Sequence, residues 1–409
     1  MTGDCCDIKR VVFLVFWPVT AFEEKKWHFD YLRSQGFEVE VFDLTYLLNR
    51  ESIINHPVTS ALQGGFIRHI NTYQELDSLL GMYAVDTLFF DSLAGLSDIR
   101  IKVEKVFRLL KKHHVRYTFI STGVLPLPAS TLGAVKSLTA TVRKAINPLK
   151  LWNFLASKWI VMLSKHGLVY PLPFIIFGGR SEVLQQYISK RNIGREKIIQ
   201  THSFDYDTYL YYRRSQGEKA VVAENICVFL DEAITHHSDF TILGLRPIDP
   251  KEYFASMNNF FDFIEKTTGL RVVIAAHPRS EYETTPEIFG GRQIIKGKTV
   301  DLTAISSLVV MHCSTSVSFA VLFKKPVVLV KTSGIRTNSH VNTMVDTMAA
   351  ALGVQPIDVD KNRLVPSLLN ENIDQKKYEA YLYKYIKSPT AEEMPTWEIV
   401  SSAIKKLKF

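Results

Sequence analysis

The stretch VVIAAHPRSEY, residues 272–282, joins an apolar run to a histidine, a proline and an arginine. The run at 272–276 begins with β-branched residues and is cut off by Pro278, which is typical of a parallel-sheet strand buried on both faces. Ligands of open α/β sheets bind beyond the carboxyl ends of such strands. We therefore expect a binding loop at His277, Pro278 and Arg279, although a loop histidine without a role is the simpler alternative.

Strand and helix signals alternate on both sides of this stretch, which indicates parallel sheets with helices on their faces. The expected strands are residues 10–18, 37–44, 85–92, 115–121, 173–179 and 197–203, then 225–232, 271–276, 292–297, 307–312 and 325–332. The expected helices are residues 21–36, 73–81, 99–114, 182–189, 249–269, 300–307 and 314–324. We predict an α/β protein of two Rossmann-like, doubly wound domains with a cleft between them.

A chain of 409 residues is too long for one ordinary core, and the alternation suggests where it divides. We place the N-terminal domain at residues 1–205, with an insertion at about 125–173 where the regular alternation stops. The second domain follows at 206–390. The last segment, 391–409, is expected to form a helix that packs back on the N-terminal domain, because its apolar residues share one helical face.

The net charge of +8 is unevenly distributed. Residues 105–181 contain twelve Lys or Arg and no Asp or Glu, so the rest of the chain is slightly acidic. The positive electrostatic field of such a segment attracts anionic sugars, lipid phosphates or a membrane surface. For any single lysine, a place on a solvated basic face is an equally good explanation. Nucleic acid is not expected as a partner, because no nucleic-acid-binding motif accompanies the charge.

The first ten residues are charged where a signal peptide needs an apolar core, so secretion is not expected. The most apolar long segment, residues 159–177, is interrupted by Lys165, His166 and two prolines, which argues against a membrane span. The four cysteines have no zinc-ligand spacing and are expected to be free thiols. These features favour a cytoplasmic protein, whose only expected membrane contact is peripheral, at the inner membrane.

Two acids, Asp231 and Glu232, stand at the end of the expected strand 225–232. Adjacent side chains of an extended chain point to opposite faces, so we expect one of the two to face the cleft. Asp231 is the first catalytic candidate and Glu232 the second, with a loop or helix-capping acid as the alternative. A carboxylate beside an anomeric carbon can act as a nucleophile or as the base that deprotonates an acceptor hydroxyl.

Two further strand ends carry residues suited to phosphate binding. The histidine and arginine of the 277–279 loop can donate hydrogen bonds to a phosphate. Ser314, Thr315 and Ser316 stand before an amphipathic helix, where hydroxyls and free N–H groups bind anions; one of them could instead be a simple N-cap. The loop lacks the ATPase phosphate-loop pattern, and no cluster of metal ligands is evident.

The triplets LDE, HPR and STS, in this order, resemble motifs of bacterial transferases that use CMP-activated ulosonic acids, the sialyltransferase-like and Kdo-transferase enzymes. The resemblance is strongest to the retaining β-Kdo transferases of the WbbB type. It covers about residues 200–335, while the first half of the chain is similar in architecture more than in motifs.

This resemblance implies a GT-B-like fold and a donor, CMP-β-Kdo, that leaves CMP as the product. An aspartate in the place of Asp231 is the family's proposed nucleophile, and His277 with the Ser314–Ser316 loop would hold the CMP phosphate. No metal or cofactor would be needed, because protein donors stabilise the leaving phosphate. The acceptor would be an O-antigen or related surface glycan, carried on a lipid. The carboxylate of Kdo would need cationic partners, for which the candidates are Arg279, Lys331 and Arg336.

Other functions stay open. An inverting CMP-sugar transferase, or a glycerophosphotransferase with a CDP-alcohol donor, would share the cytidine nucleotide. A nucleotide-binding scaffold of a polysaccharide assembly complex would bind CMP without turnover. A sugar-nucleotide 2-epimerase has the same architecture, but it needs catalytic acids in the first half of the chain, where residues 105–181 have none.

Overall fold

The computed structural model describes residues 7–406 except 56–57, 59, 84–85, 94–100, 122–124, 127–158, 160–173, 179–197, 218–221, 237–247, 279, 362 and 370–371. Most of the insertion predicted at 125–173 and the helix predicted at 182–189 lie outside these residues. The chain divides into two compact units. Unit 1 comprises Met1–Thr122, Ala134–His202 and Ser388–Phe409, and unit 2 comprises Gly123–Gly133 and Ser203–Lys387.

Unit 1 is built on a seven-stranded parallel sheet in the order β3-β2-β1-β4-β5-β6-β7. Its strands are β1 (Arg10–Val15), β2 (Glu38–Asp43), β3 (Ile67–His69), β4 (Thr87–Asp91), β5 (Arg116–Ser121), β6 (Phe174–Gly178) and β7 (Ile198–Thr201). The connecting helices are α1 (Ala21–Lys26), α2 (Phe29–Ser34), α3 (Thr45–Asn55), α4 (Tyr73–Met82) and α5 (Ile101–Lys112). β1 and β4 are neighbours where the strand order reverses, as in a doubly wound sheet.

Unit 1 differs from the sequence prediction at α3, which was not predicted, and at two further features. The single helix predicted at 21–36 is two helices, because His28 adopts a left-handed conformation (φ 48°) that breaks the hydrogen-bond ladder between α1 and α2. The prediction also missed β3, an edge strand of three residues, IRH, that lacks an apolar run. The buried strands β1 and β4 were predicted from runs of consecutive apolar residues, five in β1 and three in β4.

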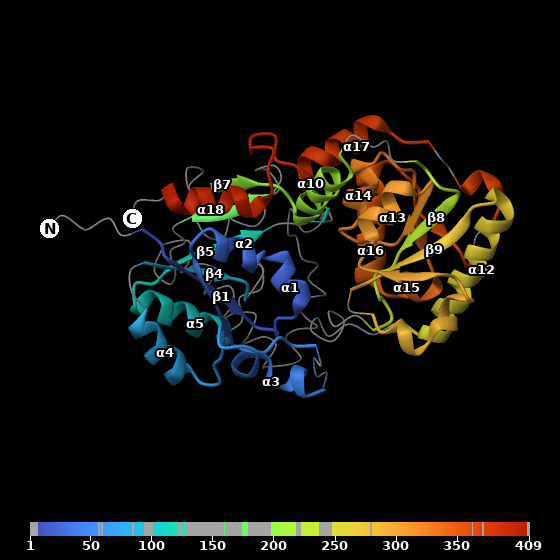
Figure 1. Cartoon of the computed structure of the whole chain (residues 1–409). Helices are drawn as coiled ribbons and strands as arrows, with labels where there is room; N and C mark the ends of the chain where they lie inside the picture. The colour runs from blue at the N-terminus through green and yellow to red at the C-terminus, as the bar shows by residue number, and fades with distance from the viewer. Residues whose placement is uncertain are drawn as a thin grey trace. The chain divides into compact units, whose positions relative to one another are not determined.

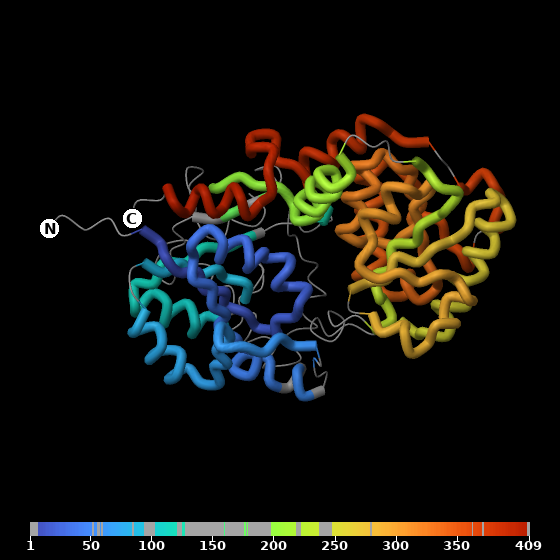
Figure 2. The backbone as a smooth tube through the Cα atoms, in the orientation of Figure 1, coloured from blue at the N-terminus to red at the C-terminus, as the bar shows by residue number. Residues whose placement is uncertain are grey.

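The last helix of the chain, α18 (Thr396–Lys406), belongs to unit 1. It lies next to β7 and α2, far from both in sequence (Figure 2). Trp397 anchors it: the indole packs edge-on against Phe13 and Phe90 of the sheet and donates a hydrogen bond to the Lys26 carbonyl (3.1 Å). The N-terminal strands and the C-terminal helix therefore share one core.

Unit 2 has a six-stranded parallel sheet in the order β10-β9-β8-β11-β12-β13. The strands are β8 (Ile226–Leu230), β9 (Arg271–Ala276), β10 (Ile294–Lys296), β11 (Leu308–Met311), β12 (Val327–Lys331) and β13 (Ile357–Asp358). The strand order reverses between β8 and β11, so this is the switch point at which ligands of such sheets bind. The edge strand β13 was not predicted, because two residues are too short for a periodic signal.

Helices cover both faces of this second sheet; Figure 1 shows α12 on one side of β8 and β9 and α13 on the other. The helical segments are α10 (Phe204–Gln216), α12 (Pro250–Thr268), α13 (Thr299–Ile305), α14 (Val317–Leu322), α15 (Ser333–Thr337), α16 (Ser339–Leu352) and α17 (Gln375–Tyr381), with short turns η2 (Tyr282–Thr284), η3 (Pro286–Phe289), η4 (Pro366–Leu368) and η5 (Leu382–Ile386). The predicted helix at 249–269 is α12, which begins at an Asp249 cap and ends at Gly269 (φ 73°). None of the helices within the described residues is both long and apolar enough to cross a membrane.

Candidate functional site

The candidate site lies at the carboxyl end of β8, the strand at the centre of the unit 2 sheet. Asp231 and Glu232 follow its last residue, Leu230, as predicted from the sequence. The next residue, Ala233, has a left-handed backbone (φ 47°), a conformation that costs energy for any residue except glycine. The chain therefore turns sharply just after the two acids, at the switch point of the sheet.

Asp231 forms hydrogen bonds with residues that follow β9. Its Oδ2 accepts a hydrogen bond from the backbone N–H of His277 (3.1 Å), and its Oδ1 accepts from the Tyr282 hydroxyl and the Ala233 N–H (3.1 Å each). The residue is only 6% exposed. Burial raises the pKa of the Asp231 carboxyl, while the three hydrogen bonds act in the opposite direction.

Glu232 forms hydrogen bonds with residues that follow the other neighbouring strand, β11. Its Oε1 accepts hydrogen bonds from the backbone N–H groups of His312 (2.9 Å) and Cys313 (2.7 Å). Burial raises the pKa of Glu232 to about 7, although these donors favour the ionised form. The two acids thus link the end of β8 to the ends of both neighbouring strands.

A buried histidine that the sequence did not single out supports the Glu232 contact. His312 Nδ1 lies 2.8 Å from the Val330 carbonyl and Nε2 lies 2.9 Å from the Tyr253 hydroxyl. Because a carbonyl can only accept, Nδ1 carries the proton and Nε2 accepts from Tyr253. Burial lowers the pKa of His312 to about 4, so the ring is neutral at physiological pH. Its fixed ring holds the loop whose N–H groups face Glu232.

The His-Pro-Arg loop follows β9, as predicted. The His277 carbonyl accepts hydrogen bonds from the N–H (2.9 Å) and hydroxyl (2.8 Å) of Ser280, which close the loop into a turn. His277 is half-buried and Pro278 is exposed. Arg279 lies outside the described residues. The backbone of this loop meets Asp231, so two of the motifs found in the sequence are in direct contact.

Ser314, Thr315 and Ser316 connect β11 to α14, and all three are partly exposed. The Ser314 hydroxyl accepts a hydrogen bond from the Ser316 N–H (3.2 Å), and the Thr315 carbonyl accepts from the Ser318 hydroxyl (2.7 Å). α14 has only six residues, so its dipole contribution is small compared with that of a long helix. The loop begins next to Cys313, which binds Glu232.

The two described cations proposed for the sugar carboxylate are paired with acids of unit 2. Lys331, the last residue of β12, lies 2.5 Å from Asp346 of α16, and its side chain is 11% exposed. Arg336 lies 3.0 Å from Asp358 at the end of β13. Binding a ligand carboxylate at either cation would require it to share its positive charge with the resident acid.

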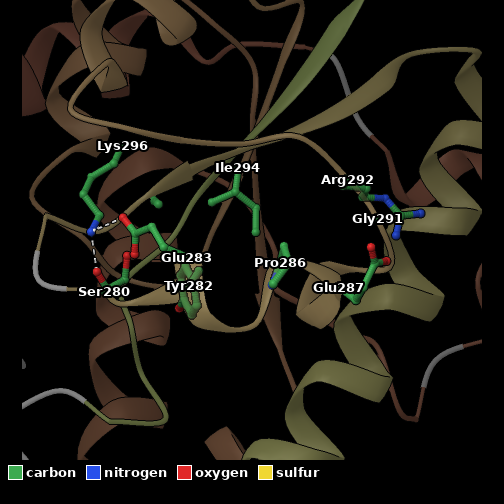
Figure 3. Close-up of a pocket in the computed structure, with 10 residues that line it drawn as sticks. Ser280, Tyr282, Glu283, Pro286, Glu287, Gly291, Arg292, Ile294 and Lys296 are labelled. Carbon is green, nitrogen blue, oxygen red and sulfur yellow. Dashed lines mark hydrogen bonds and ion pairs between the residues drawn. The ribbon is translucent and has the colours of Figure 1, made fainter.

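A pocket of about 330 Å³ adjoins the Asp231 site along the edge strand β10 (Figure 3). Charged side chains stand at both ends: Lys296 pairs with Glu283 (2.7 Å) at one, and Glu287 and Arg292 lie at the other. Ile294 and Pro286 lie between them (Figure 3). Tyr282 lines this pocket and also donates its hydroxyl to Asp231, which connects the pocket to the acid. Sequence reasoning missed Tyr282, since nothing marks it apart from other tyrosines.

Chemically, the site presents two carboxylates with different surroundings at one switch point. Asp231 is nearly dry and fixed by three uncharged donors, as a positioned nucleophile would be. For Glu232, burial raises the pKa to about 7. Within the described part of the chain, no group of three or more His, Cys, Asp or Glu side chains is placed to hold a metal ion.

Among the comparisons with known proteins, only that with solved structures found matches. No protein-family model matches the chain, and no curated protein matches its sequence. Among solved structures, the wall teichoic acid polymerase TagF is similar with a TM-score of 0.52 and 11% identity, over 98% of this chain and 90% of that one. UDP-GlcNAc 2-epimerase of Methanocaldococcus jannaschii has a TM-score of 0.47 and 10% identity, over 96% of this chain and 99% of that one.

MnaA of S. aureus, solved with UDP, has a TM-score of 0.45 and 12% identity, over 96% of this chain and 95% of that one. The likeness to TagF, which has the highest TM-score of the three, and the two parallel α/β units give this chain a GT-B-like fold of two Rossmann-like domains. The predicted fold class is therefore confirmed. At these identities, the likeness extends to the fold alone.

Proposed function

We propose that the protein is a metal-independent glycosyltransferase that moves Kdo from CMP-β-Kdo to a hydroxyl of a bacterial surface glycan, with retention of configuration. The observation that carries the proposal is the contact between Asp231 and the His277 loop, at 3.1 Å between Oδ2 and the backbone nitrogen. The proposed nucleophile and the proposed phosphate-binding loop meet at the switch point of a GT-B-like sheet. The resemblance of the LDE, HPR and STS motifs to Kdo transferases supplies the identity of the donor.

In the first step, a carboxylate oxygen of Asp231 bonds to the anomeric carbon of Kdo. The bond from that carbon to the phosphate oxygen of CMP breaks, and its electron pair leaves with CMP. In the second step, the acceptor hydroxyl gives its proton to a base and its oxygen bonds to the same carbon. The bond from that carbon to Asp231 breaks, and its electron pair returns to the carboxylate. Two inversions give net retention.

The contacts of Asp231 and Glu232 support the roles that we propose for the surrounding residues. The N–H groups of Ala233 and His277 and the Tyr282 hydroxyl hold the Asp231 carboxylate in one orientation. His277, Arg279 and the Ser314–Ser316 loop are the proposed phosphate donors, which would stabilise charge on departing CMP without a divalent cation. Glu232 is proposed to fix the start of the Ser314–Ser316 loop through its bonds to His312 and Cys313.

Two partner surfaces complete the proposal. Unit 1 and the basic insertion at 125–173 would bind the acceptor, an O-antigen or related glycan carried on a lipid. The same basic insertion would keep the protein at the anionic surface of the inner membrane, on its cytoplasmic side.

The proposal is tested by incubating the protein with CMP-Kdo and candidate oligosaccharides and determining the mass and anomeric configuration of the product. A β-linked Kdo product is expected. An α-linked product would show inversion and leave the acids only the role of a base. Turnover of a CDP-alcohol instead of CMP-Kdo, resolved by liquid chromatography, would identify a glycerophosphotransferase. Binding of CMP without turnover of either donor would identify a scaffold.

A further inference from the structure

An aspartate and a histidine pair at the ends of two neighbouring strands of unit 1. β2 ends at Asp43 and β3 ends at His69, and the two residues are register partners in the sheet. The His69 Nδ1 atom lies 2.9 Å from the Asp43 Oδ2 atom. Both side chains therefore stand at the carboxyl edge of the unit 1 sheet, the edge at which α/β sheets bind ligands.

Both oxygens of the Asp43 carboxylate have hydrogen-bond partners. Its Oδ1 accepts hydrogen bonds from the Thr45 N–H (2.9 Å) and from the Thr45 hydroxyl, and the residue is 5% exposed. Because an ionised carboxylate can only accept, the neutral imidazole of His69 carries its proton on Nδ1 and its lone pair on Nε2. The aspartate thus fixes both the orientation and the tautomer of the histidine.

The His69 side chain is 47% exposed, and Nε2 has no hydrogen-bond partner among the described residues. The two hydrogen bonds from Thr45 to Asp43 close a local turn, which does not account for an imidazole that is fixed on one side and open on the other. Two exposed aromatic residues, Phe22 in α1 and Tyr46 in α3, belong to the helices that follow β1 and β2. Their rings offer flat apolar surface at the same edge, against which the C–H face of a sugar can pack.

We propose that Asp43 and His69 form a proton-accepting dyad that activates the hydroxyl of a sugar acceptor bound by unit 1. This inference rests on the proposed glycosyl transfer. As the acceptor oxygen bonds to the anomeric carbon, its O–H bond breaks and the proton passes to Nε2 of His69. The electron pair of the breaking glycosyl bond leaves with the displaced group. Asp43 is a positioning residue, which stabilises the imidazolium that forms.

The test compares His69→Ala and His69→Gln with the wild type, using CMP-Kdo and the methyl glycosides of galactose, mannose and N-acetylglucosamine as probes. Transfer to the glycoside should fall by about 100-fold or more in both variants, the usual contribution of a general base. Covalent capture of Kdo by the enzyme without acceptor should be unchanged, and added imidazole should restore transfer in His69→Ala. His114→Asn, at an exposed loop histidine of unit 1, is the matched control. Near-normal transfer by folded His69→Gln would overturn the dyad.

A second readout does not depend on turnover. Nitrogen-15 spectra of the imidazoles should show His69 as the Nδ1–H tautomer, and Asp43→Asn should change its tautomer ratio while His114 is unaffected. Adding the methyl glycosides should move the His69 Nε2 resonance. If the wild type transfers no Kdo from CMP-Kdo, the proposed function is wrong. The nitrogen-15 spectra then remain as the test of the Asp43–His69 dyad. A His69 signal that no glycoside moves would overturn it.

Discussion

At the carboxyl edge of unit 1, Asp43 is tied to a half-exposed imidazole, whereas at the carboxyl edge of unit 2, Asp231 is tied to two backbone N–H groups and a phenol. Both acids end a strand of the same kind of doubly wound sheet, and both are nearly inaccessible. The partner decides what each acid can do. An acid beside an imidazole can orient a base. An acid held by uncharged donors has no base beside it, so its own oxygens are the atoms that could react.

The largest expected effect is that of Asp231→Asn. The amide keeps the shape of the carboxylate but lacks its nucleophilic charge, so turnover should fall by about 1,000-fold or more, equivalent to about 4 kcal/mol. CMP affinity, measured by calorimetry, should be unchanged. Asp30→Asn, at an acid on the surface of unit 1, serves as the control and should leave turnover at the wild-type level. Near-normal turnover by Asp231→Asn would reject the catalytic role of Asp231.

Tyr282→Phe tests how strongly Asp231 is held. It removes one hydrogen-bond donor to Asp231 and keeps the ring that lines the pocket. The free energy of unfolding should fall by about 1.5–3 kcal/mol, the range for a hydrogen bond to a charged group. Denaturant titration of wild type and variant measures it. Tyr46→Phe, at an exposed tyrosine of unit 1, should change stability by a few tenths of a kcal/mol at most. Equal stabilities of Tyr282→Phe and wild type would mean that the bond to Asp231 contributes nothing.

Glu232→Gln gives a smaller effect that depends on pH. Burial raises the pKa of Glu232 to about 7, above its ordinary value of 4.5, so ionising this group opposes folding. Glu232 contributes its full amount to the free energy of unfolding below about pH 4.5, and this contribution is lost as the pH rises through 7. Glu232→Gln should therefore match the wild type near pH 4.5 and exceed its stability at pH 8 by up to about 3 kcal/mol, since each unit of pKa shift is worth about 1.4 kcal/mol.

Thermal unfolding across this pH range measures the Glu232 effect, with Glu379→Gln, at an exposed residue of α17, as the control. A gain in stability that is the same at pH 4.5 and pH 8 would show that the change acts through packing and not through the charge of Glu232.

The parts of the fold that could be predicted are those with a strong periodic signal. β8 and β9 are uninterrupted apolar runs, and the long amphipathic helix α12 has a capping aspartate and a glycine stop. The edge strands β3 and β13 could not be predicted, because three and two residues carry no periodicity and depend on a neighbouring strand for their hydrogen bonds. The break between α1 and α2 depends on the backbone of His28, for which the local sequence has no glycine or proline signal.

For the candidate site, the sequence predicted which residues stand at the ends of strands, but not which residues they contact. The positions of Asp231 and Glu232 follow from an apolar run that stops, yet their partners stand about 50 and 80 residues further on, in Tyr282 and the 312–313 loop. The neutral state of His312 requires its burial between Tyr253 and Val330, which no spacing of residues reveals. Likewise, Lys331 looked available for a ligand, because its partner Asp346 lies on a helix that was not predicted.

The central claim, a covalent intermediate on Asp231, is tested most directly by intact-protein mass spectrometry of the wild type with CMP-Kdo and no acceptor. We expect a mass increase of one Kdo residue, mapped by peptide sequencing to Asp231. The adduct should be lost on adding a glycan acceptor and absent from Asp231→Asn. An adduct on Glu232, or steady release of CMP by a wild type that never carries an adduct under rapid acid quenching, would contradict it.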